Sequence, residues 1–328
     1  MKVRSVYMLA AVTVAAATAL MSIPAFAQTG VPPEVAAQLR AIGPVIDVPA
    51  VGKIYAPLQA DAPRDGVKRT NDVQYGPDAR HRLDVYEPAA KGGAALPVFV
   101  FIHGGGFVRG DKSTPGTPFY DNIGYYFARH GVLAILATYR LAPLNPWPAG
   151  GKDVGAVIKW TRANAARFGG DPKRIVLMGH SAGAAHAAAY GLDKGFQPAG
   201  GPGIVGLILM AGVYDPDMES RSGTRFGPGP KESNEAYYGK NTGKYAERAP
   251  IRHMSGPTLP VMLIVSELDP PMMHIETGAL YSALCHRDKV CPELVTPRDH
   301  DHISEAYAIN TPDETVSGPV LAFIQARK

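Results

Sequence analysis

The chain carries Gly179-His180-Ser181-Ala182-Gly183 between a short apolar run, residues 174–178, and a run of strong helix formers, residues 184–190. A Gly-x-Ser-x-Gly between a strand and a helix is typical of a nucleophile elbow, a strained turn that lifts the serine hydroxyl above the sheet edge. Glycines two positions before and after the serine remove side chains that would collide in this turn. The strand–turn–helix context therefore predicts that Ser181 is a nucleophile.

A glycine triplet follows an earlier buried-strand pattern at residues 96–102 and forms the motif His103-Gly104-Gly105-Gly106-Phe107. Successive glycines let backbone N–H groups approach a substrate oxygen without steric hindrance. Gly105 and Gly106 are the expected donors of an oxyanion hole, with Ala182 as a third donor and Gly104 in reserve. Glycine triplets also form plain turns, but the elbow on the same chain favours the oxyanion hole.

The acid that orients the base is expected after Ser181 along the chain. Residues 259–265 predict another buried strand, which runs into Ser266-Glu267-Leu268-Asp269-Pro270. An acid at the carboxyl end of a parallel strand lies on the ligand-binding edge of the sheet. We predict Asp269 as this acid because Pro270 ends the strand there, and Glu267 is the alternative.

Two histidines compete for the role of base in Arg298-Asp299-His300-Asp301-His302-Ile303-Ser304, which follows the last strand pattern at residues 293–297. His302 is predicted because it directly precedes Ile303 and a helical stretch at residues 304–309, and His300 is the reserve. Two histidines with flanking aspartates also suit zinc. A third ligand in a His-Glu-x-x-His or Cys-x-x-Cys pattern is absent from the sequence, so we expect neither a metal nor a cofactor.

Several motifs in combination resemble α/β-hydrolase carboxylesterases, close to the hormone-sensitive-lipase-like group and its kynurenine-formamidase and bacterial-esterase neighbours. The resemblance covers residues 72–328 and rests on the glycine motif, Tyr139-Arg140-Leu141-Ala142-Pro143, Trp147-Pro148-Ala149 with Asp153, and Phe168-Gly169-Gly170-Asp171-Pro172. It implies an α/β-hydrolase fold, ester hydrolysis without a cofactor, and a triad of Ser181, Asp269 and His302. The chain departs from the hormone-sensitive-lipase-like pattern at His180, where that group usually has aspartate.

Two other functions stay open at this level. An amidase or arylformamidase would use the same triad, and a non-catalytic exported binding protein would keep the fold but lose a triad member. All three triad candidates are present, which favours an esterase acting on a small or medium small-molecule ester. Five residues are candidates for the pocket, although each suits a core equally well: Phe107, Trp147, Tyr214, Met272 and Met273.

The N-terminus predicts export. Lys2 and Arg4 precede an apolar stretch at residues 6–21, and Ala25-Phe26-Ala27 is a small-x-small cleavage pattern. Together they predict a secretory signal peptide at residues 1–27 and a periplasmic or extracellular protein. A membrane anchor is the alternative, but the run is short, rich in alanine and broken by Pro24. We therefore expect no membrane-spanning segment after cleavage.

Composition suits one globular catalytic domain at residues 72–328, with 46% hydrophobic and 19% charged residues. Alternating patterns predict a mostly parallel central sheet flanked by helices. Strands are expected at residues 82–86, 98–102, 132–138, 175–178, 205–210, 261–265 and 294–296, and helices at 121–130, 153–168, 182–192 and 275–284. A proline-rich extension at residues 28–71, with a helix at 33–42, and a polar insertion at 216–256 are expected to form a small cap. A solvated loop is the alternative for the insertion.

The formal net charge of +4 is partly that of Lys2 and Arg4, and the charges are otherwise mixed along the chain, so no nucleic-acid partner is expected. Cys285 and Cys291 are the two cysteines of the sequence. In an exported chain their close spacing predicts a disulfide between the helix at residues 275–284 and the strand before His302. Two free thiols are the alternative.

Overall fold

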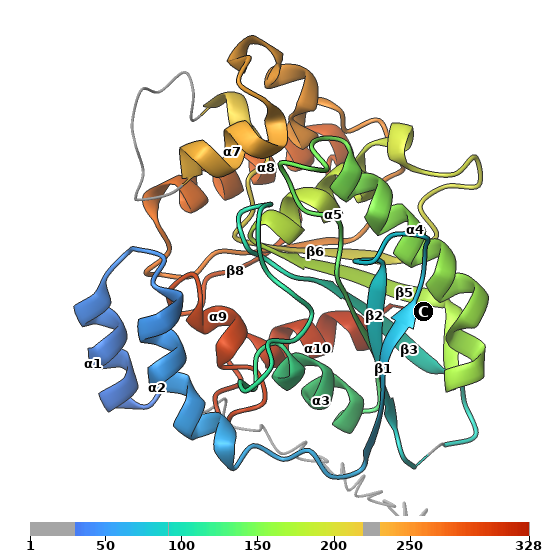
Figure 1. The fold of residues 1–328 in the computed structure, drawn as a ribbon, viewed down its shortest axis with the longest axis vertical. Coiled ribbons are helices and arrows are strands. Elements are labelled where there is room, and N and C mark those ends of the chain that lie inside the picture. Colours follow the sequence, from blue (N-terminus) through green and yellow to red (C-terminus); the bar gives the residue numbers. More distant parts are fainter. Residues whose placement is uncertain (1–29, 91, 219–229, 328) are drawn as a thin grey trace, which may run out of the picture.

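A computed structural model describes residues 30–90, 92–218 and 230–327 (Figure 1). The predicted signal peptide, residues 1–27, and part of the predicted cap insertion, residues 219–229, lie outside the described residues. Among the helices of the described part, none combines the length and the apolar character that crossing a bilayer requires.

The described residues form one eight-stranded sheet in the order β1-β2-β4-β3-β5-β6-β7-β8. The pairs β1–β2 and β2–β4 are antiparallel and the others are parallel, which confirms the predicted mostly parallel sheet. The strands are β1 (Val67–Gln74), β2 (Arg82–Pro88), β3 (Leu96–Ile102), β4 (Leu133–Ala137), β5 (Gly170–His180), β6 (Gly206–Met210), β7 (Val261–Ile264) and β8 (Glu293–Val295).

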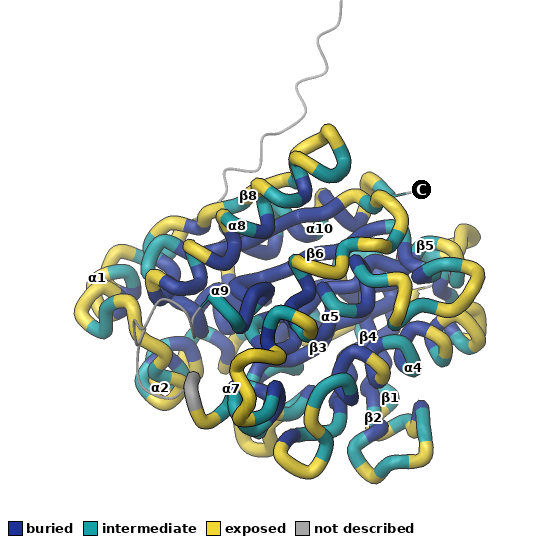
Figure 2. The backbone as a smooth tube through the Cα atoms, turned by 90° about the horizontal axis from the view of Figure 1, so that it is seen from above, coloured by how far each residue is buried: buried dark blue, intermediate teal, exposed yellow. Residues whose placement is uncertain are grey.

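Helices cover both faces of this sheet (Figure 1). One face packs on α4 (Ala149–Asn164), α5 (Ala182–Leu192) and α8 (Pro271–Asp288), and the other on α3 (Asp121–Arg129) and α10 (Ser317–Gln325). In β3, Val98 and Val100 belong to the core on the side of α4, α5 and α8, whereas Phe99 and Phe101 belong to the core on the side of α3 and α10. Burial on both faces explains why the central strands are continuous apolar runs. Figure 2 shows these buried strands enclosed by exposed turns.

The helices predicted at residues 33–42 and 182–192 match α1 (Pro33–Ile42) and α5. The helix predicted from residue 153 begins earlier, at Ala149, and ends at Asn164, where a 3-10 turn, Ala165–Phe168, takes over. The strand β1 crosses the expected domain boundary at residue 72. Its residues are mainly polar and partly exposed, because it is the edge strand of the sheet, and it therefore lacks an apolar pattern.

The N-terminal extension contains a second helix, α2 (Val48–Ala60), that the sequence pattern did not predict. Pro57 lies inside this helix, where proline normally disfavours helical structure. Tertiary packing compensates, because Val51 and Tyr55 are buried in the core. At the end of α2 the Gln59 side chain donates hydrogen bonds to two carbonyls in the C-terminal part of the chain, those of Tyr307 (2.9 Å) and Ile309 (2.7 Å).

The helix α2 lies beside the C-terminal helix α9 (Ser304–Tyr307), and α1 packs against α2 on the side away from α9, as Figure 1 shows. Arg40, in α1, forms an ion pair with Asp299 and lies 3.7 Å from a carboxylate oxygen of Glu267. Glu267 follows β7 and Asp299 follows β8. The extension therefore packs on the two loops that the sequence predicts to carry the acid and the base.

The described part of the predicted cap insertion contains α7 (Pro230–Tyr238) and three short 3-10 turns. Tyr237, Tyr238 and Tyr245 are buried in one aromatic cluster with Phe107. The rings of Phe107 and Tyr237 stack with their centroids 4.6 Å apart. These contacts attach the insertion to the glycine loop that follows β3.

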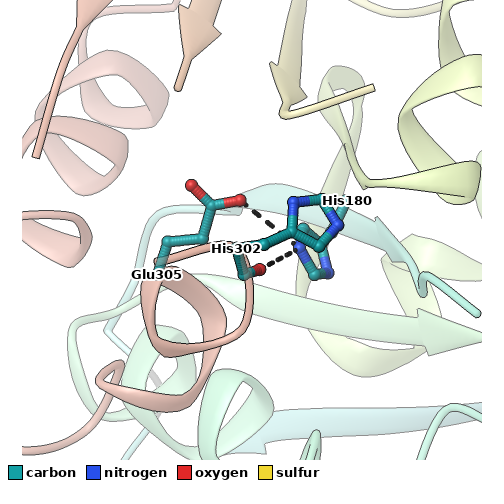
Figure 3. A group of neighbouring side chains, drawn as sticks. All are labelled: His180, His302 and Glu305. Carbon is teal, nitrogen blue, oxygen red and sulfur yellow. Dashed lines mark hydrogen bonds and ion pairs between the residues drawn. The ribbon is translucent and has the colours of Figure 1, made fainter. Parts of the chain in front are cut away.

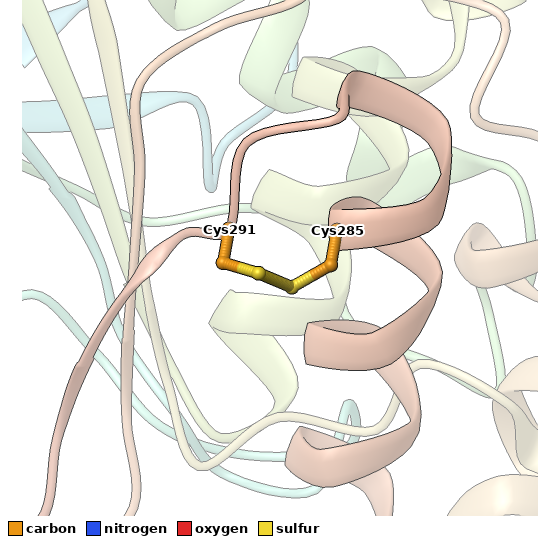
Figure 4. The surroundings of a disulfide bond; sticks show 2 residues. All are labelled: Cys285 and Cys291. Atoms are coloured by element: carbon orange, nitrogen blue, oxygen red, sulfur yellow. A yellow bond between two sulfur atoms is a disulfide. The ribbon is translucent and has the colours of Figure 1, made fainter.

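Cys285 and Cys291 form the disulfide that their spacing predicts (Figure 4). It joins the last turn of α8 to the residues that precede β8. The bond closes the short connection between α8 and β8, the strand that leads toward His302.

Candidate active site

Ser181 occupies the turn between β5 and α5 with φ 55° and ψ −122°, a sparsely populated backbone conformation for a residue with a side chain. The flanking glycines explain how the turn fits. A Cβ on Gly183 would overlap the carbonyl oxygen of Ile102, and a Cβ on Gly179 would overlap the Gly183 main chain. Close packing of the backbone therefore requires glycine at positions 179 and 183. The half-buried Ser181 side chain lines a cavity.

The imidazole of His302 lies between Ser181 and Asp269. Its Nε2 is 2.9 Å from Ser181 Oγ, and its Nδ1 is 2.8 Å from Asp269 Oδ1. Because a carboxylate only accepts hydrogen bonds, Nδ1 is the donor and the Nε2 lone pair faces the serine hydroxyl. His302 and Asp269 are 1% and 2% exposed, so water hardly competes for these bonds. The structure thus brings the three residues of the predicted triad into one hydrogen-bonded chain.

Asp269 is held by the turn that follows β7. Its second carboxylate oxygen accepts a hydrogen bond from the Ser266 backbone N–H at 2.6 Å, and its own N–H donates to the Ser266 carbonyl at 3.0 Å. Pro270 and Pro271 follow directly, and α8 begins at Pro271. The carboxylate is therefore fixed at both oxygens before any substrate is present.

Glu267, the alternative acid, does not contact His302. Its carboxylate accepts a hydrogen bond from the Asp299 N–H at 2.8 Å and lies near Arg40. It thus connects the loops after β7 and β8 on the side that faces α1.

His300, the reserve base, is completely buried and turned away from Ser181. Its Nε2 lies 2.8 Å from Thr315 Oγ1 and 2.9 Å from Asp313 Oδ2, and its Nδ1 lies 3.1 Å from Ser304 Oγ. Its Nε2 therefore connects the loop to the segment that leads into α10, and its Nδ1 connects the loop to the start of α9.

The Asp-His-Asp-His segment does not gather its side chains around one point, because His300 and His302 face different partners. A different group, His180, His302 and Glu305, places three ligand-type atoms within 4.8 Å of one another (Figure 3). Both nitrogens of His302 are engaged by Ser181 and Asp269. The His302 nitrogens are therefore already used in hydrogen bonds within the protein.

The glycine loop after β3 lies against the elbow. Gly105 has φ +124°, a conformation that favours glycine, and a Cβ on Gly104 would lie 3.1 Å from the Cβ of Ser181. Ala182 is the first residue of α5, so its N–H has no partner within the helix. Gly104, Gly105, Gly106 and Ala182 all line the same cavity as Ser181.

His103 supports the glycine loop from behind. Its Nδ1 lies 2.6 Å from the Gly104 carbonyl oxygen, and its ring stacks on Tyr139 with the centroids 4.4 Å apart. Complete burial lowers the pKa of His103 to about 3, so the imidazole is neutral at physiological pH. It braces the loop without adding a charge next to the cavity.

The cavity beside Ser181 has a volume of about 240 Å³. Of the residues predicted for the pocket, Phe107 and Met273 line it, whereas Trp147, Tyr214 and Met272 do not. Trp147 lies in a separate surface groove and Tyr214 is fully buried. The sequence pattern missed further apolar or aromatic wall residues from other parts of the chain, among them Ile46, Val48, Tyr120, Val213 and Tyr307.

The chain is similar to curated esterases of Mycobacterium tuberculosis. It is 28% identical to esterase LipQ over 226 residues, which are 66% of this chain and 52% of LipQ. It is 40% identical to carboxylesterase NlhH over 116 residues, which are 35% of this chain and 34% of NlhH. The chain thus spans about half or less of the length of these relatives.

Solved structures with the same fold include esterase B of Lactobacillus rhamnosis, with a TM-score of 0.69, 19% identity, and coverage of 89% of this chain and 95% of that chain. Esterase LipW of Mycobacterium marinum has a TM-score of 0.61 and 27% identity, and 83% of each chain is covered. A family model described as BD-FAE matches residues 83–284, well over half of the chain. The resemblance to α/β-hydrolase carboxylesterases is therefore confirmed, and the chain belongs to the BD-FAE family.

Proposed function

We propose that the protein hydrolyses small-molecule carboxylic esters through a covalent acyl-enzyme formed on Ser181. The observation that carries the proposal is the hydrogen-bond chain from Ser181 Oγ through His302 to Asp269, at 2.9 Å and 2.8 Å. Nucleophile, base and orienting acid within hydrogen-bond distance are the arrangement that serine acyl transfer requires. The similarity to LipQ and NlhH supports the same reaction class.

In the acylation step, His302 Nε2 takes the Ser181 proton while Oγ attacks the ester carbonyl carbon. The carbonyl oxygen becomes negatively charged and receives hydrogen bonds from the N–H groups of Gly105, Gly106 and Ala182. Asp269 stabilises the imidazolium that forms. The tetrahedral intermediate then collapses, and His302 donates its proton to the leaving alcohol.

In the deacylation step, a water molecule takes the place of the alcohol. His302 removes a proton from this water, which attacks the acyl carbon, and the same oxyanion donors stabilise the second intermediate. Collapse returns the proton to Ser181 Oγ and releases the carboxylic acid. The free hydroxyl is restored, so the cycle needs no further reactant.

A small or medium acyl group fits the cavity beside Ser181. The cavity volume is about 240 Å³. Phe107, Val213 and Met273 supply apolar wall, while Ile46 and Val48 extend the wall outward and are each 40% exposed. The exposed position of these two residues favours substrates with an apolar part that reaches past the inner cavity.

The test is hydrolysis of p-nitrophenyl esters from acetate to palmitate by the parent chain and by Ser181→Ala. We expect a rate that is highest for short or medium acyl chains and is lost in the variant. Paired ester and amide substrates with the same acyl group separate an esterase from an amidase. Full activity of Ser181→Ala would rule out the proposed nucleophile.

We also propose that the protein is exported. The signal-peptide pattern at residues 1–27 and the Cys285–Cys291 disulfide support this, because disulfides persist in oxidising compartments. Expression of the full chain in a Gram-negative host, followed by mass spectrometry of the periplasmic fraction, tests it. We expect a chain that begins at Gln28. An uncleaved chain that still carries residues 1–27 and is found in the membrane fraction would contradict cleavage.

A further inference from the structure

A second buried carboxyl group lies behind the proposed triad. Glu305 is completely buried and lies in α9, three residues after His302. Its Oε2 forms a 2.6 Å hydrogen bond with Ser266 Oγ. Ser266 is the residue whose backbone N–H holds Asp269. Glu305 is thus linked through one residue to the acid of the triad.

Glu305 also faces the residue that holds the base. Its Oε1 lies 3.3 Å from His180 Nε2, and the same nitrogen is 2.8 Å from the main-chain oxygen of His302 (Figure 3). Since a carbonyl oxygen only accepts, His180 Nε2 carries the proton and donates it. His180 is 1% exposed and immediately precedes Ser181. One imidazole therefore connects the nucleophile turn to the backbone of the base.

We propose that Glu305 and His180 are positioning residues, which join the Ser266 turn that carries Asp269 and the main chain of His302 into one buried network. The inference rests on the proposed function, because it assigns a role relative to that triad. Neither residue forms a hydrogen bond with Ser181 Oγ. Glu305 acts through Ser266, and His180 acts through the main chain of His302.

The protonation states support a neutral network. Burial, and then the charge of Asp269, raise the pKa of Glu305 well above that of an ordinary carboxyl group. Burial, and then His302, lower the pKa of His180 well below its usual value. If Glu305 is neutral, Asp269 is the anion that contacts the imidazole of His302. The 2.6 Å contact between Glu305 Oε2 and Ser266 Oγ suits an O–H···O hydrogen bond with either oxygen as the donor. The titratable groups around Glu305 are Asp269, Asp301, His180, His302, Tyr120 and Tyr214.

Two variants of Glu305 test the network. Glu305→Gln keeps a neutral hydrogen-bonding group, whereas Glu305→Leu keeps the volume and removes both contacts. With p-nitrophenyl acetate, we expect Glu305→Leu to lower kcat about 10–100-fold with KM within about 3-fold, because misplacement of reacting groups mainly affects the chemical step. Glu305→Gln should restore kcat to within about 3-fold of the parent and leave the acid limb of the kcat–pH profile in place.

Coupling to His180 is the second measurement. His180→Phe should lower kcat like Glu305→Leu, and the double variant should lose much less than the product of the two single losses, because both act through one network. Multiplicative losses would overturn the proposal. An acid limb that moves to lower pH in Glu305→Gln would show that Glu305 is charged, and would overturn the neutral network.

The matched control is Glu276→Leu, which removes a buried carboxylate whose hydrogen bonds go to the backbone of Tyr214 and Asp215. We expect it to lower Tm without the kcat loss of Glu305→Leu. Labelling of Ser181 by a fluorophosphonate gives a second readout, independent of substrate, and should slow in parallel with kcat. Equal kcat losses in both carboxylate variants, or full kcat in Glu305→Leu, would overturn the inference alone. An inactive, unlabelled parent would refute the proposed function as well.

Discussion

The floor and the rim of the cavity differ in how they are built. The floor consists of the loops after β5, β7 and β8, which carry Ser181, Asp269 and His302. The rim is the turn between α1 and α2 together with the first residue of α2, where Ile46 and Val48 line the cavity. On the floor, His302 and Asp269 are at most 2% exposed and hydrogen-bonded, whereas the two rim residues are apolar and each 40% exposed.

This contrast separates two tasks. Buried hydrogen bonds hold the floor groups in one geometry, which suits chemistry that tolerates little displacement. Exposed apolar side chains make few fixed contacts, and they gain burial when an apolar ligand covers them. We therefore expect changes on the floor to lower kcat, and changes on the rim to alter which esters are used.

The largest effect is expected on the floor at Ser181. Ser181→Ala should lower kcat for p-nitrophenyl acetate by about 10⁴–10⁶-fold, because the acyl-enzyme can no longer form. Fluorophosphonate labelling followed by mass spectrometry should also be lost. The control is Ser282→Ala on the exposed side of α8, which should be labelled like the parent. Undiminished labelling of Ser181→Ala would break the assignment of the floor.

The two acids after β7 sharpen the distinction within the floor. Asp269→Asn should lower kcat by about 10³–10⁴-fold, because an amide at this position favours the wrong tautomer of His302. Glu267→Gln removes the neighbouring carboxylate, which faces Arg40 and Asp299 instead, and should retain kcat. Steady-state kinetics of both variants give the comparison, and the reverse pattern would exchange the two roles.

The stability of the protein around the floor should depend on pH, because two buried histidines lie next to it, His103 after β3 and His186 in α5. Burial lowers the pKa values of His103 and His186 to about 3, so both are neutral when folded, whereas in the unfolded chain they gain protons below about pH 6.5. Stability should therefore fall as pH falls from about 6.5 toward 3, by roughly 1–2 kcal/mol per histidine between pH 7 and 5.

Urea unfolding at the two pH values measures this loss. His186→Asn removes one of the two groups and should reduce the difference between pH 7 and pH 5, even if the variant is less stable at both. An unchanged difference would show that His186 gains its proton equally in the folded state. It would then contradict the view that the region packed against the floor is dry and closed.

The smallest effect is expected on the rim. The double variant Ile46→Ala, Val48→Ala should lower kcat/KM for p-nitrophenyl octanoate about 3–10-fold, because part of an apolar contact is lost. Hydrolysis of the acetate should change little. Val45→Ala is the matched control, since Val45 is 37% exposed in the same turn but does not line the cavity. Equal losses for acetate and octanoate would contradict a separate role for the rim.

Much of the fold was predictable because it depends on local patterns. The helix after Ser181 matches its predicted range, and the central strands are the apolar runs that a sheet buried on both faces requires. The elements that were missed have weak local signals. Pro57 argues against α2, and β1 is polar because it lies at the edge of the sheet. The helix α2 depends on contacts with distant parts of the chain, and β1 depends on pairing with β2 at the edge of the sheet.

The site divides in the same way. The sequence by itself determined the elbow at Ser181, the glycine loop and the short segments in which an acid and a histidine had to lie, because each has a local signature. Only the tertiary structure decided which members form the chain, turning His302 toward Ser181 and Asp269 toward His302, and turning His300 and Glu267 away. It also placed Ile46, Val48 and Glu305 beside the site. The physical reason is that the orientation of a side chain depends on packing between segments far apart in the chain, which no local pattern encodes.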